Sequence, residues 1–199
     1  MTGDEANRAV LTVGYGRGFV VQGARERFVI TAAHCLPFFP PCASHSFAEE
    51  RTYRELLGSL ASEPTVWAEC LFADPVGDIA VLGPPERPDL CPAYEELTEA
   101  AATLNIAESP SETAAQLLSL DDRWFGCRVR RYGGPLWISD AEESIRGGMS
   151  GSPILTDDWC AIGIICSGSD ETDGARSFES GPDARLTHHL PGWLLWQIS

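Results

Sequence analysis

A serine between glycines marks the stretch of this sequence that is best suited to chemistry. Residues 147–153 read Gly-Gly-Met-Ser-Gly-Ser-Pro and lead into the apolar pair at 154–155. Glycine adopts backbone conformations closed to other residues and leaves no side chain to block an approaching substrate. A bend here could expose the Ser150 hydroxyl and turn the N–H groups of Gly148 and Ser150 toward the oxygen that becomes negative when a hydroxyl attacks a carbonyl. For these seven residues alone, an ordinary glycine- and serine-rich turn is the alternative interpretation.

Two further residues could complete a catalytic set with this serine. His34 follows an apolar run and two alanines, so its imidazole has room to move over a neighbouring site. Asp78 opens another apolar run, where a carboxylate is costly unless it is hydrogen-bonded, and a histidine N–H could satisfy it. Asp74 is the rival acid, but Pro75 separates it from the apolar run and favours a solvated turn. Taken alone, His34 could equally be an ordinary core or edge histidine.

The segments that would position these residues have the pattern of short β-strands. In the first half, strand-like runs lie at residues 9–13, 18–21, 28–31, 53–58, 65–72 and 79–82. In the second half, they lie at residues 104–106, 116–120, 124–131, 136–138, 152–155 and 160–166. Residues 169–182 are polar and predict a loop, and residues 190–196 fit a short terminal helix with a proline in its first turn. Many short strands separated by turn signals predict a β-sandwich or β-barrels.

Composition limits the classes of function. At 199 residues, the chain can form one sizeable domain or two small packed ones, and 44% hydrophobic residues indicate a globular fold. The net charge of −15 argues against nucleic acid and against anionic membranes as partners, although it could simply serve solubility. No stretch of about 20 apolar residues could span a bilayer, and no signal peptide is expected.

Cysteine usage bears on location and on metal binding. Seven cysteines are scattered without a C-x-x-C pair, which is typical of reduced thiols and predicts a cytoplasmic protein. A metal site formed by Cys35, Cys42 and His45 is conceivable, but the spacing matches no standard zinc pattern. We expect neither a metal nor a cofactor.

With His34, Asp78 and Ser150 in this chain order, the sequence resembles the chymotrypsin/trypsin-like serine peptidases. Three motifs carry the resemblance: Thr-Ala-Ala-His-Cys at 31–35, Gly-Asp-Ile-Ala-Val-Leu at 77–82 and Gly-Met-Ser-Gly-Ser-Pro at 148–153. The resemblance implies an all-β fold of two six-stranded Greek-key barrels packed face to face, with a short C-terminal helix.

The same resemblance implies a division of the chain. It implies an N-terminal barrel over residues 1–91, a linker over 92–103 and a C-terminal barrel with the terminal helix over 104–199. The catalytic residues would then lie in the cleft between the barrels, with His34 and Asp78 on the first barrel and Ser150 on the second.

The implied activity is that of a serine endopeptidase working through an acyl-enzyme. Ser150 would attack the scissile carbonyl, His34 would act as general base and then as general acid, and Asp78 would fix the histidine tautomer. The N–H groups of Gly148 and Ser150 would form the oxyanion hole. Two alternatives stay open: a catalytically silent binding module with a peptidase fold, and an esterase-type hydrolase that uses the same triad.

The resemblance also implies a substrate pocket. Ser144 would lie at its base, and Cys166, Ser167 and Gly168 would line it. Since none of these residues is charged, we expect an uncharged side chain on the amino side of the cleaved bond. Three nearby acids could attract a basic side chain instead: Asp170, Glu171 and Asp173.

Departures from the secreted members are informative. Met149 stands where those enzymes have an aspartate that pairs with a new N-terminal amine, so activation by cleavage is not expected. Activity would instead be restrained by narrow specificity, by a partner or by an oxyanion loop that orders only on binding. The resemblance implies a disulfide partner for Cys35 about sixteen residues earlier, where this sequence has Phe19. These departures suggest an intracellular, bacterial member. Its protein or peptide substrate, or a regulatory partner, could be encoded nearby.

Overall fold

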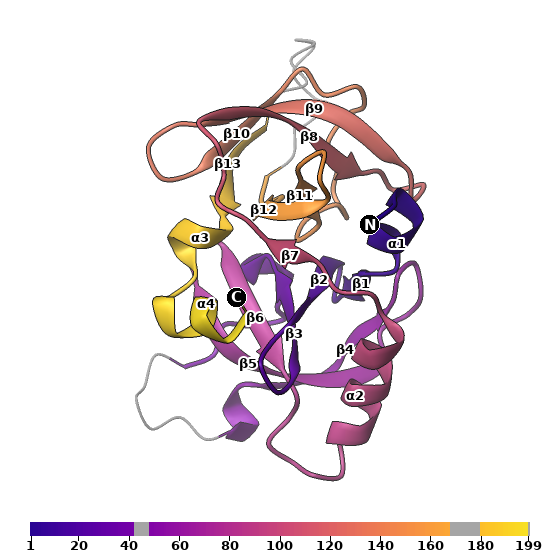
Figure 1. Ribbon diagram of the computed structural model, residues 1–199. Coiled ribbons are helices and arrows are strands. Elements are labelled where there is room, and N and C mark those ends of the chain that lie inside the picture. Colours follow the sequence, from indigo (N-terminus) through magenta and orange to yellow (C-terminus); the bar gives the residue numbers. More distant parts are fainter. Residues whose placement is uncertain (42–47, 168–179, 199) are drawn as a thin grey trace.

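Two β-barrels, one above the other, make up the computed structural model, which describes residues 1–41, 48–167 and 180–198 (Figure 1). The first barrel consists of β1 (Val10–Val13), β2 (Gly16–Gln22), β3 (Arg27–Thr31), β4 (Thr52–Ser59), β5 (Val66–Asp74) and β6 (Ile79–Gly83). These strands close in the antiparallel order β1-β2-β3-β6-β5-β4. Every residue of β6 is buried, as its uninterrupted apolar sequence predicts.

The second barrel repeats the arrangement of the first. It consists of β8 (Glu112–Leu118), β9 (Trp124–Arg131), β10 (Leu136–Ser139), β11 (Pro153–Leu155), β12 (Cys160–Ile164) and β13 (Ser180–Arg185). Its order is β8-β9-β10-β13-β12-β11, and pairing of β11 with β8 closes it. Both barrels therefore have the same Greek-key connectivity, and the prediction of two six-stranded barrels is confirmed.

The sixth strand of the second barrel differs from the strand that the sequence pattern predicts. The predicted loop over residues 169–182 ends in β13, which pairs with both β10 and β12. The predicted strand at 104–106 forms β7 (Asn105–Ile106), which lies outside the barrel and runs parallel to β12. β13 was missed because its polar Ser-Gly-Pro-Asp-Ala-Arg sequence has no apolar alternation, and its strand geometry comes from pairing with distant segments.

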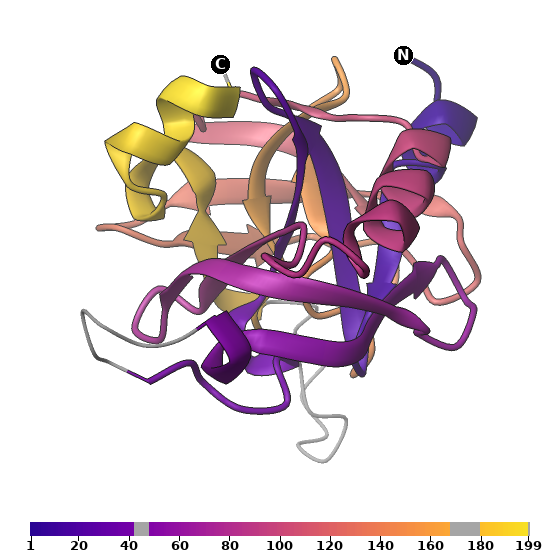
Figure 2. The same cartoon turned by 90° about the horizontal axis from the view of Figure 1, so that it is seen from below.

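Helices lie outside the barrels. They are α1 (Gly3–Asn7), α2 (Cys91–Ala100), α3 (Leu186–His189) and α4 (Gly192–Ile198), with the short 3₁₀ helices η1 (Ala33–Cys35) and η2 (Ala48–Glu50). Most of the segment predicted as a linker is thus the helix α2, and its buried Tyr94 hydroxyl donates to the carbonyl of Arg27 on β3 at 2.9 Å. Viewed from below, α2 and the C-terminal helices lie on opposite sides of the first barrel (Figure 2). In the described part of the chain, no helix is long and apolar enough to cross a membrane.

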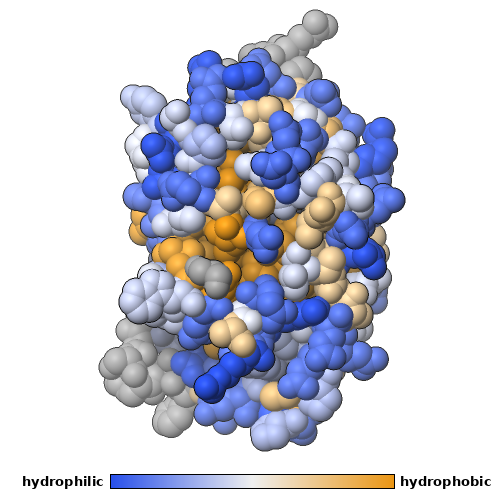
Figure 3. All heavy atoms as spheres, in the orientation of Figure 1, coloured by the Kyte–Doolittle hydropathy of each residue, from blue (hydrophilic) through white to orange (hydrophobic). Residues whose placement is uncertain are grey.

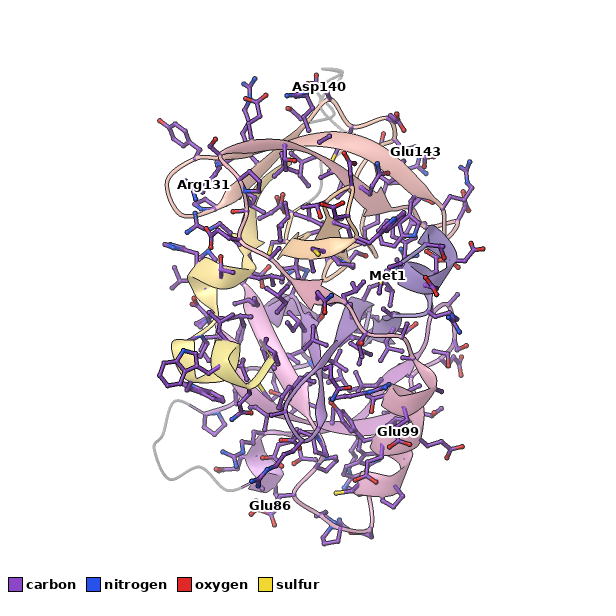
Figure 4. The ribbon with its side chains drawn as sticks, viewed as in Figure 1. Met1, Glu86, Glu99, Arg131, Asp140 and Glu143 are labelled. Atoms are coloured by element: carbon purple, nitrogen blue, oxygen red, sulfur yellow. The ribbon has the colours of Figure 1, made fainter. Side chains whose placement is uncertain are left out.

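The two barrels share an apolar interface. Buried residues of the first barrel pack in one continuous core with residues of the second, including Leu118, Leu155 and Ile164. The face seen in Figure 3 is mostly polar, with apolar side chains gathered at mid-height, where the barrels meet. Labelled acids lie around the periphery of both barrels: Glu86, Glu99, Asp140 and Glu143 (Figure 4). These four acids thus lie on the outside of the two barrels. The site described next lies at the barrel junction.

Candidate active site

A histidine and an aspartate meet beside the barrel junction. His34 lies in η1, directly after β3, and Asp78 lies in the turn between β5 and β6. The Asp78 carboxylate accepts a hydrogen bond from the backbone N–H of His34 at 2.9 Å, and its other oxygen lies 2.7 Å from His34 Nδ1. Because both bonds go to one residue, the carboxylate fixes the position of the histidine backbone as well as the orientation of its ring.

The electrostatics of this pair suit proton transfer. Hydrogen bonding to Asp78 raises the pKa of His34 above its ordinary value, although partial burial works against the shift. When the neutral ring donates its Nδ1 proton to the carboxylate, Nε2 is left as a proton acceptor. The His34 side chain is 46% exposed, so a substrate can reach it.

The backbone of Asp78 adopts an uncommon conformation. Its φ of 52° lies in the left-handed region, which costs a non-glycine residue on the order of 1 kcal/mol. The Asp78 carbonyl oxygen accepts a hydrogen bond from the Ala33 N–H at 3.2 Å and from the Cys166 thiol at 3.5 Å. These contacts hold the strained turn against η1 and against the end of β12, so both barrels position the acid.

Cys166 lies behind the acid. Burial raises the pKa of its thiol far above the ordinary value, so the group stays protonated and can donate to Asp78. The sulfur also accepts a hydrogen bond from the Ala184 N–H at 3.3 Å. The family resemblance places Cys166 in the substrate pocket. Its described hydrogen bonds are with the Asp78 turn, with Ile164 on β12 and with β13.

Ser150 is the second residue of the second of two consecutive β-turns. The first spans 146–149, closed by a 3.2 Å hydrogen bond, and the second spans 149–152, closed at 3.0 Å. The third residue of each turn is a glycine with positive φ, Gly148 at 91° and Gly151 at 81°, which is typical of type II turns. The glycines on either side of Ser150 thus serve the turn geometry that the sequence suggested.

The turn that carries Ser150 is docked on the first barrel. The Ser150 carbonyl accepts a hydrogen bond from the backbone N–H of Arg17 on β2 at 2.7 Å and lies 3.7 Å from the Cys35 sulfur. A Cβ on Gly151 would overlap the carbonyl oxygen of Arg17, so no side chain fits there. The Ser150 backbone is therefore fixed beside Cys35, the residue that directly follows His34, at the barrel junction where His34 and Asp78 meet. Among the hydrogen bonds of the described residues, none joins the Ser150 hydroxyl to the His34 ring.

The residue facing Cys35 is Gly16 and not Phe19. A Cβ on Gly16 would lie 2.5 Å from the Cys35 sulfur, whereas Phe19 pairs with Ile30 and is buried inside the first barrel. The expected spacing of about sixteen residues points to Phe19 and not to Gly16, because it does not account for the length of the β2–β3 hairpin in this chain. The Cys35 thiol is free, and burial raises its pKa to about 11.

The predicted pocket residues are described only in part. Ser144 is half-buried beside the fully buried Ile145. Ser167 donates its N–H to the Asp183 carboxylate at 3.3 Å, and its hydroxyl accepts from the Gly181 N–H at 3.0 Å. Gly168 and the three nearby acids at 170, 171 and 173 lie outside the described residues.

Two acids at the site were missed or misjudged from the sequence. Asp183, which is almost completely buried, accepts the backbone N–H groups of both Cys166 and Ser167, and the only signal for it was an isolated acid inside a polar segment. Asp74 does not lie in a freely solvated turn: one carboxylate oxygen accepts the Val76 N–H at 2.9 Å and the other lies 3.6 Å from His189 Nδ1.

The Asp74–His189 pair has its own electrostatics. Burial alone would raise the pKa of Asp74, but hydrogen bonds from Gly77 and Val76 outweigh it and hold the value below the ordinary range. Burial lowers the pKa of His189, and the neighbouring His188 adds to this effect. The His189 ring packs directly on Gly77, the residue before Asp78, so this second pair supports the turn of the first.

Among the described residues, no group of three or more His, Cys, Asp or Glu side chains could hold a metal ion. Cys42 and His45, two members of the conceivable metal site, lie outside the ranges that the structure describes.

Comparison with known proteins gives one family match. A family model for the trypsin-like peptidase domain matches residues 16–164. Among solved structures, the serine protease of a human pathogenic astrovirus is similar, at 17% identity over 93% of this chain and 94% of that chain, with a TM-score of 0.52. An inactive mutant form of Rv3671c from Mycobacterium tuberculosis is similar at 16% identity over 92% and 83%, with a TM-score of 0.53. At these identities the structural likeness concerns the fold. No curated protein matches the sequence.

Proposed function

The chain belongs to the trypsin-like peptidase family, and we propose that it is a serine endopeptidase that cleaves a protein substrate through an acyl-enzyme on Ser150. One observation carries the proposal. The His34 ring is oriented by Asp78, and the Ser150 backbone is held next to the residue that follows His34. A nucleophile, a base and an orienting carboxylate are the parts that covalent acyl transfer requires.

The proposed first step forms the acyl-enzyme. The Ser150 hydroxyl oxygen bonds to the carbonyl carbon of the scissile peptide, while His34 Nε2 takes the hydroxyl proton. The imidazolium then gives this proton to the amide nitrogen, the C–N bond breaks and the amine product leaves. Asp78 stays ionised throughout and stabilises the imidazolium through Nδ1.

The second step releases the acid product. His34 takes a proton from a water molecule, the water oxygen attacks the ester carbonyl, and the proton is returned to the Ser150 oxygen as the ester bond breaks. In both steps the N–H groups of Gly148 and Ser150 would stabilise the carbonyl oxygen as it becomes negative, each by about 3 kcal/mol. The positive φ of Gly148 sets the orientation of its peptide in the turn and supports this assignment.

Substrate preference is the next part of the proposal. An uncharged side chain would enter a pocket based at Ser144 and lined by Ser167, Gly168 and Cys166. The half-buried, uncharged Ser144 supports an uncharged preference. A peptide library varied at the residue before the cleaved bond tests it, and preferential cleavage after lysine or arginine would contradict it.

We further propose that the enzyme acts in the bacterial cytoplasm on a protein, or with a regulatory partner, encoded nearby. Six thiols in the described residues are free, which supports a reducing compartment. The test is to express the enzyme in its own cell and to identify proteins that gain a new N-terminus.

Active-site labelling tests the catalytic assignment. A fluorophosphonate should label the wild type at Ser150 and should leave Ser150→Ala unlabelled, with the position confirmed by peptide mass spectrometry. Absence of labelling in the folded wild type would favour the catalytically silent module. Comparison of matched amide and ester substrates would then separate a peptidase from an esterase.

A further inference from the structure

Arg17 on β2 extends a buried charged side chain from the first barrel into the second. Its guanidinium donates to the carbonyl oxygens of Leu118 at 3.2 Å and Ser119 at 2.8 Å, and it pairs with the Asp122 carboxylate at 3.1 Å. The side chain is only 8% exposed. A buried cation is costly unless its donors are used, so these bonds hold the segment after β8 firmly against β2.

The backbone of Arg17 holds the candidate nucleophile. As described above, its N–H donates to the Ser150 carbonyl, and its own carbonyl occupies the space beside Gly151. That carbonyl also accepts the Thr31 hydroxyl at 2.6 Å, which ties it to β3. One residue thus fixes the Ser150 turn through its backbone and the β8–β9 connection through its side chain.

The β8–β9 connection reaches the glycine assigned to the oxyanion hole. Residues 119–123 form a tight hairpin turn, in which the Arg123 N–H donates to the Ser119 hydroxyl at 3.1 Å. At its tip, Leu120 lies next to Gly148, where its Cδ2 is 3.4 Å from the position that a Cβ would take. Leu120 is 45% exposed, so it covers the turn without being a core residue.

The other side of the oxyanion turn is anchored in the second barrel. Met149 is 1% exposed and packs in the apolar core of that barrel with Ile138 and Ile145. The turn at 146–149 is therefore held from the inside by Met149 and covered from the outside by Leu120. The hairpin carrying Leu120 is held in turn by Arg17.

We propose that Arg17 is a positioning residue that presses the hairpin at 119–123 over the turn at 146–149 and so keeps the oxyanion N–H groups in place. The inference rests on the proposed function, since it concerns the same oxyanion hole. Arg17 acts through the hairpin and the Ser150 carbonyl and does not contact the substrate. Its removal should therefore weaken binding of the transition state more than binding of the substrate.

Arg17→Met tests this role, because methionine keeps an apolar stem and removes every guanidinium hydrogen bond. Arg27→Met is the matched control: Arg27 also donates to two backbone carbonyls, of Thr98 and Ala101, but it joins β3 to α2 away from the site. We expect kcat of Arg17→Met to fall about 10- to 100-fold, the loss typical of small displacements in a catalytic site. KM should change by less than about twofold, and Arg27→Met should keep the wild-type kcat.

Hydrogen exchange gives a readout that needs no catalysis. Backbone amides of 119–123 and of 147–149 should exchange faster in Arg17→Met than in the wild type, and Arg27→Met should leave them unchanged. If the wild type has no activity, the proposed function fails, while the exchange data still decide whether Arg17 orders this turn. The inference would be overturned if Arg17→Met and Arg27→Met showed the same exchange rates at these amides. It would also be overturned if the wild type is active and Arg17→Met keeps the wild-type kcat.

Leu120→Ala covers the case in which Arg17→Met does not fold. It removes no hydrogen bond from the hairpin, and Leu120 is 45% exposed and not a core residue, so the midpoint of thermal unfolding should be preserved. We expect a smaller loss of kcat with unchanged KM, together with faster exchange at 147–149. Wild-type kcat and wild-type exchange in Leu120→Ala would show that the hairpin does not support the turn.

Discussion

The Asp78 carboxylate is hydrogen-bonded to His34 at two points, to the backbone N–H at 2.9 Å and to Nδ1 at 2.7 Å. A hydrogen bond to the ring alone would orient the imidazole but would leave the His34 backbone free to move relative to Asp78. The additional backbone bond fixes η1 relative to the β5–β6 turn, so the base keeps its place when the substrate binds. The Asp78 carbonyl is held by Cys166 at the end of β12, which links this pair to the second barrel.

The first prediction concerns the pH dependence of activity. His34 must be neutral to accept a proton, and its pKa is raised, chiefly by hydrogen bonding to Asp78. We therefore expect kcat/KM of the wild type to rise with pH through an apparent pKa above about 6.5, the ordinary value of histidine. In Asp78→Asn the pKa should fall, because the carboxylate that stabilises the imidazolium is gone, and kcat should drop by about 10⁴-fold.

The pH profile can be separated from the loss of rate. NMR titration of the imidazole in Ser150→Ala, with and without Asp78→Asn, measures the His34 pKa in the absence of turnover. An unchanged pKa in the double variant would show that the carboxylate does not control the protonation of this histidine.

The second prediction concerns Gly151. Its φ of 81° is unfavourable for other residues, and a Cβ would overlap the carbonyl of Arg17. Gly151→Ala should therefore lower the free energy of unfolding by about 2 kcal/mol or more, since overpacking and backbone strain add. Urea denaturation measures the change.

Gly192→Ala is the matched control for Gly151→Ala. Gly192 is the first residue of α4, and a Cβ there would meet no atom within 4 Å. Replacing glycine by alanine where the backbone conformation allows it stabilises a protein by about 0.4–1 kcal/mol, because the unfolded chain loses conformational freedom. The control should therefore be neutral or slightly stabilising. Equal stability of the two variants would contradict the close packing of Gly151 on β2.

The third prediction concerns the Cys166 thiol, which donates to the Asp78 carbonyl. A serine hydroxyl can make the same bond, so Cys166→Ser should keep most of the activity. Cys166→Ala leaves the acid turn with one donor fewer, and should lower the free energy of unfolding by about 1 kcal/mol and reduce kcat. Parallel denaturation and kinetic measurements check both effects. If the alanine variant matched the serine variant in both, the thiol would have no role in holding the turn.

Local chemistry explains which parts of the site could be predicted from the sequence. The need of Asp78 for a hydrogen-bond donor was predictable because its carboxylate opens an apolar run, and the family resemblance identified His34 as that donor. Glycines around Ser150 likewise indicated a bend. Each of these signals is made of residues that lie within a few positions of one another, and each has a direct physical reason.

The remaining features depend on contacts between distant parts of the chain. In the sequence, nothing distinguishes Arg17 and Asp122 from ordinary surface charges. Only the packing of the two barrels brings them together and buries the arginine side chain. Strand β13 carries a glycine and a proline, so only its pairing with β10 and β12 makes it a strand. The pairing of Asp74 with His189 joins the end of β5 to the C-terminal helices. The sequence around either residue gives no indication of this pairing.

The fourth prediction follows from the opposite pKa shifts of two histidines. The pKa of His34 is raised in the folded state, so this residue stabilises the fold below pH about 6.5, and the contribution is lost as pH rises through the raised pKa. The pKa of His189 is lowered in the folded state, chiefly by burial, so the unfolded chain binds its proton more readily. The contribution of His189 to stability is therefore present above pH about 6.5 and falls as pH decreases.

Urea denaturation of the wild type, His34→Ala and His189→Ala at pH 5 and pH 8 tests these signs. Relative to the wild type, His34→Ala should lose more stability at pH 5 than at pH 8, and His189→Ala should lose more at pH 8 than at pH 5. His34 is 46% exposed, so its pH-dependent difference should stay below about 1 kcal/mol because solvent screens the pair. His189 is 18% exposed and should show the larger difference. The same pH trend in both variants would contradict the assignment of Asp78 as the partner that favours the charged form of His34 and of burial as the factor that keeps His189 neutral.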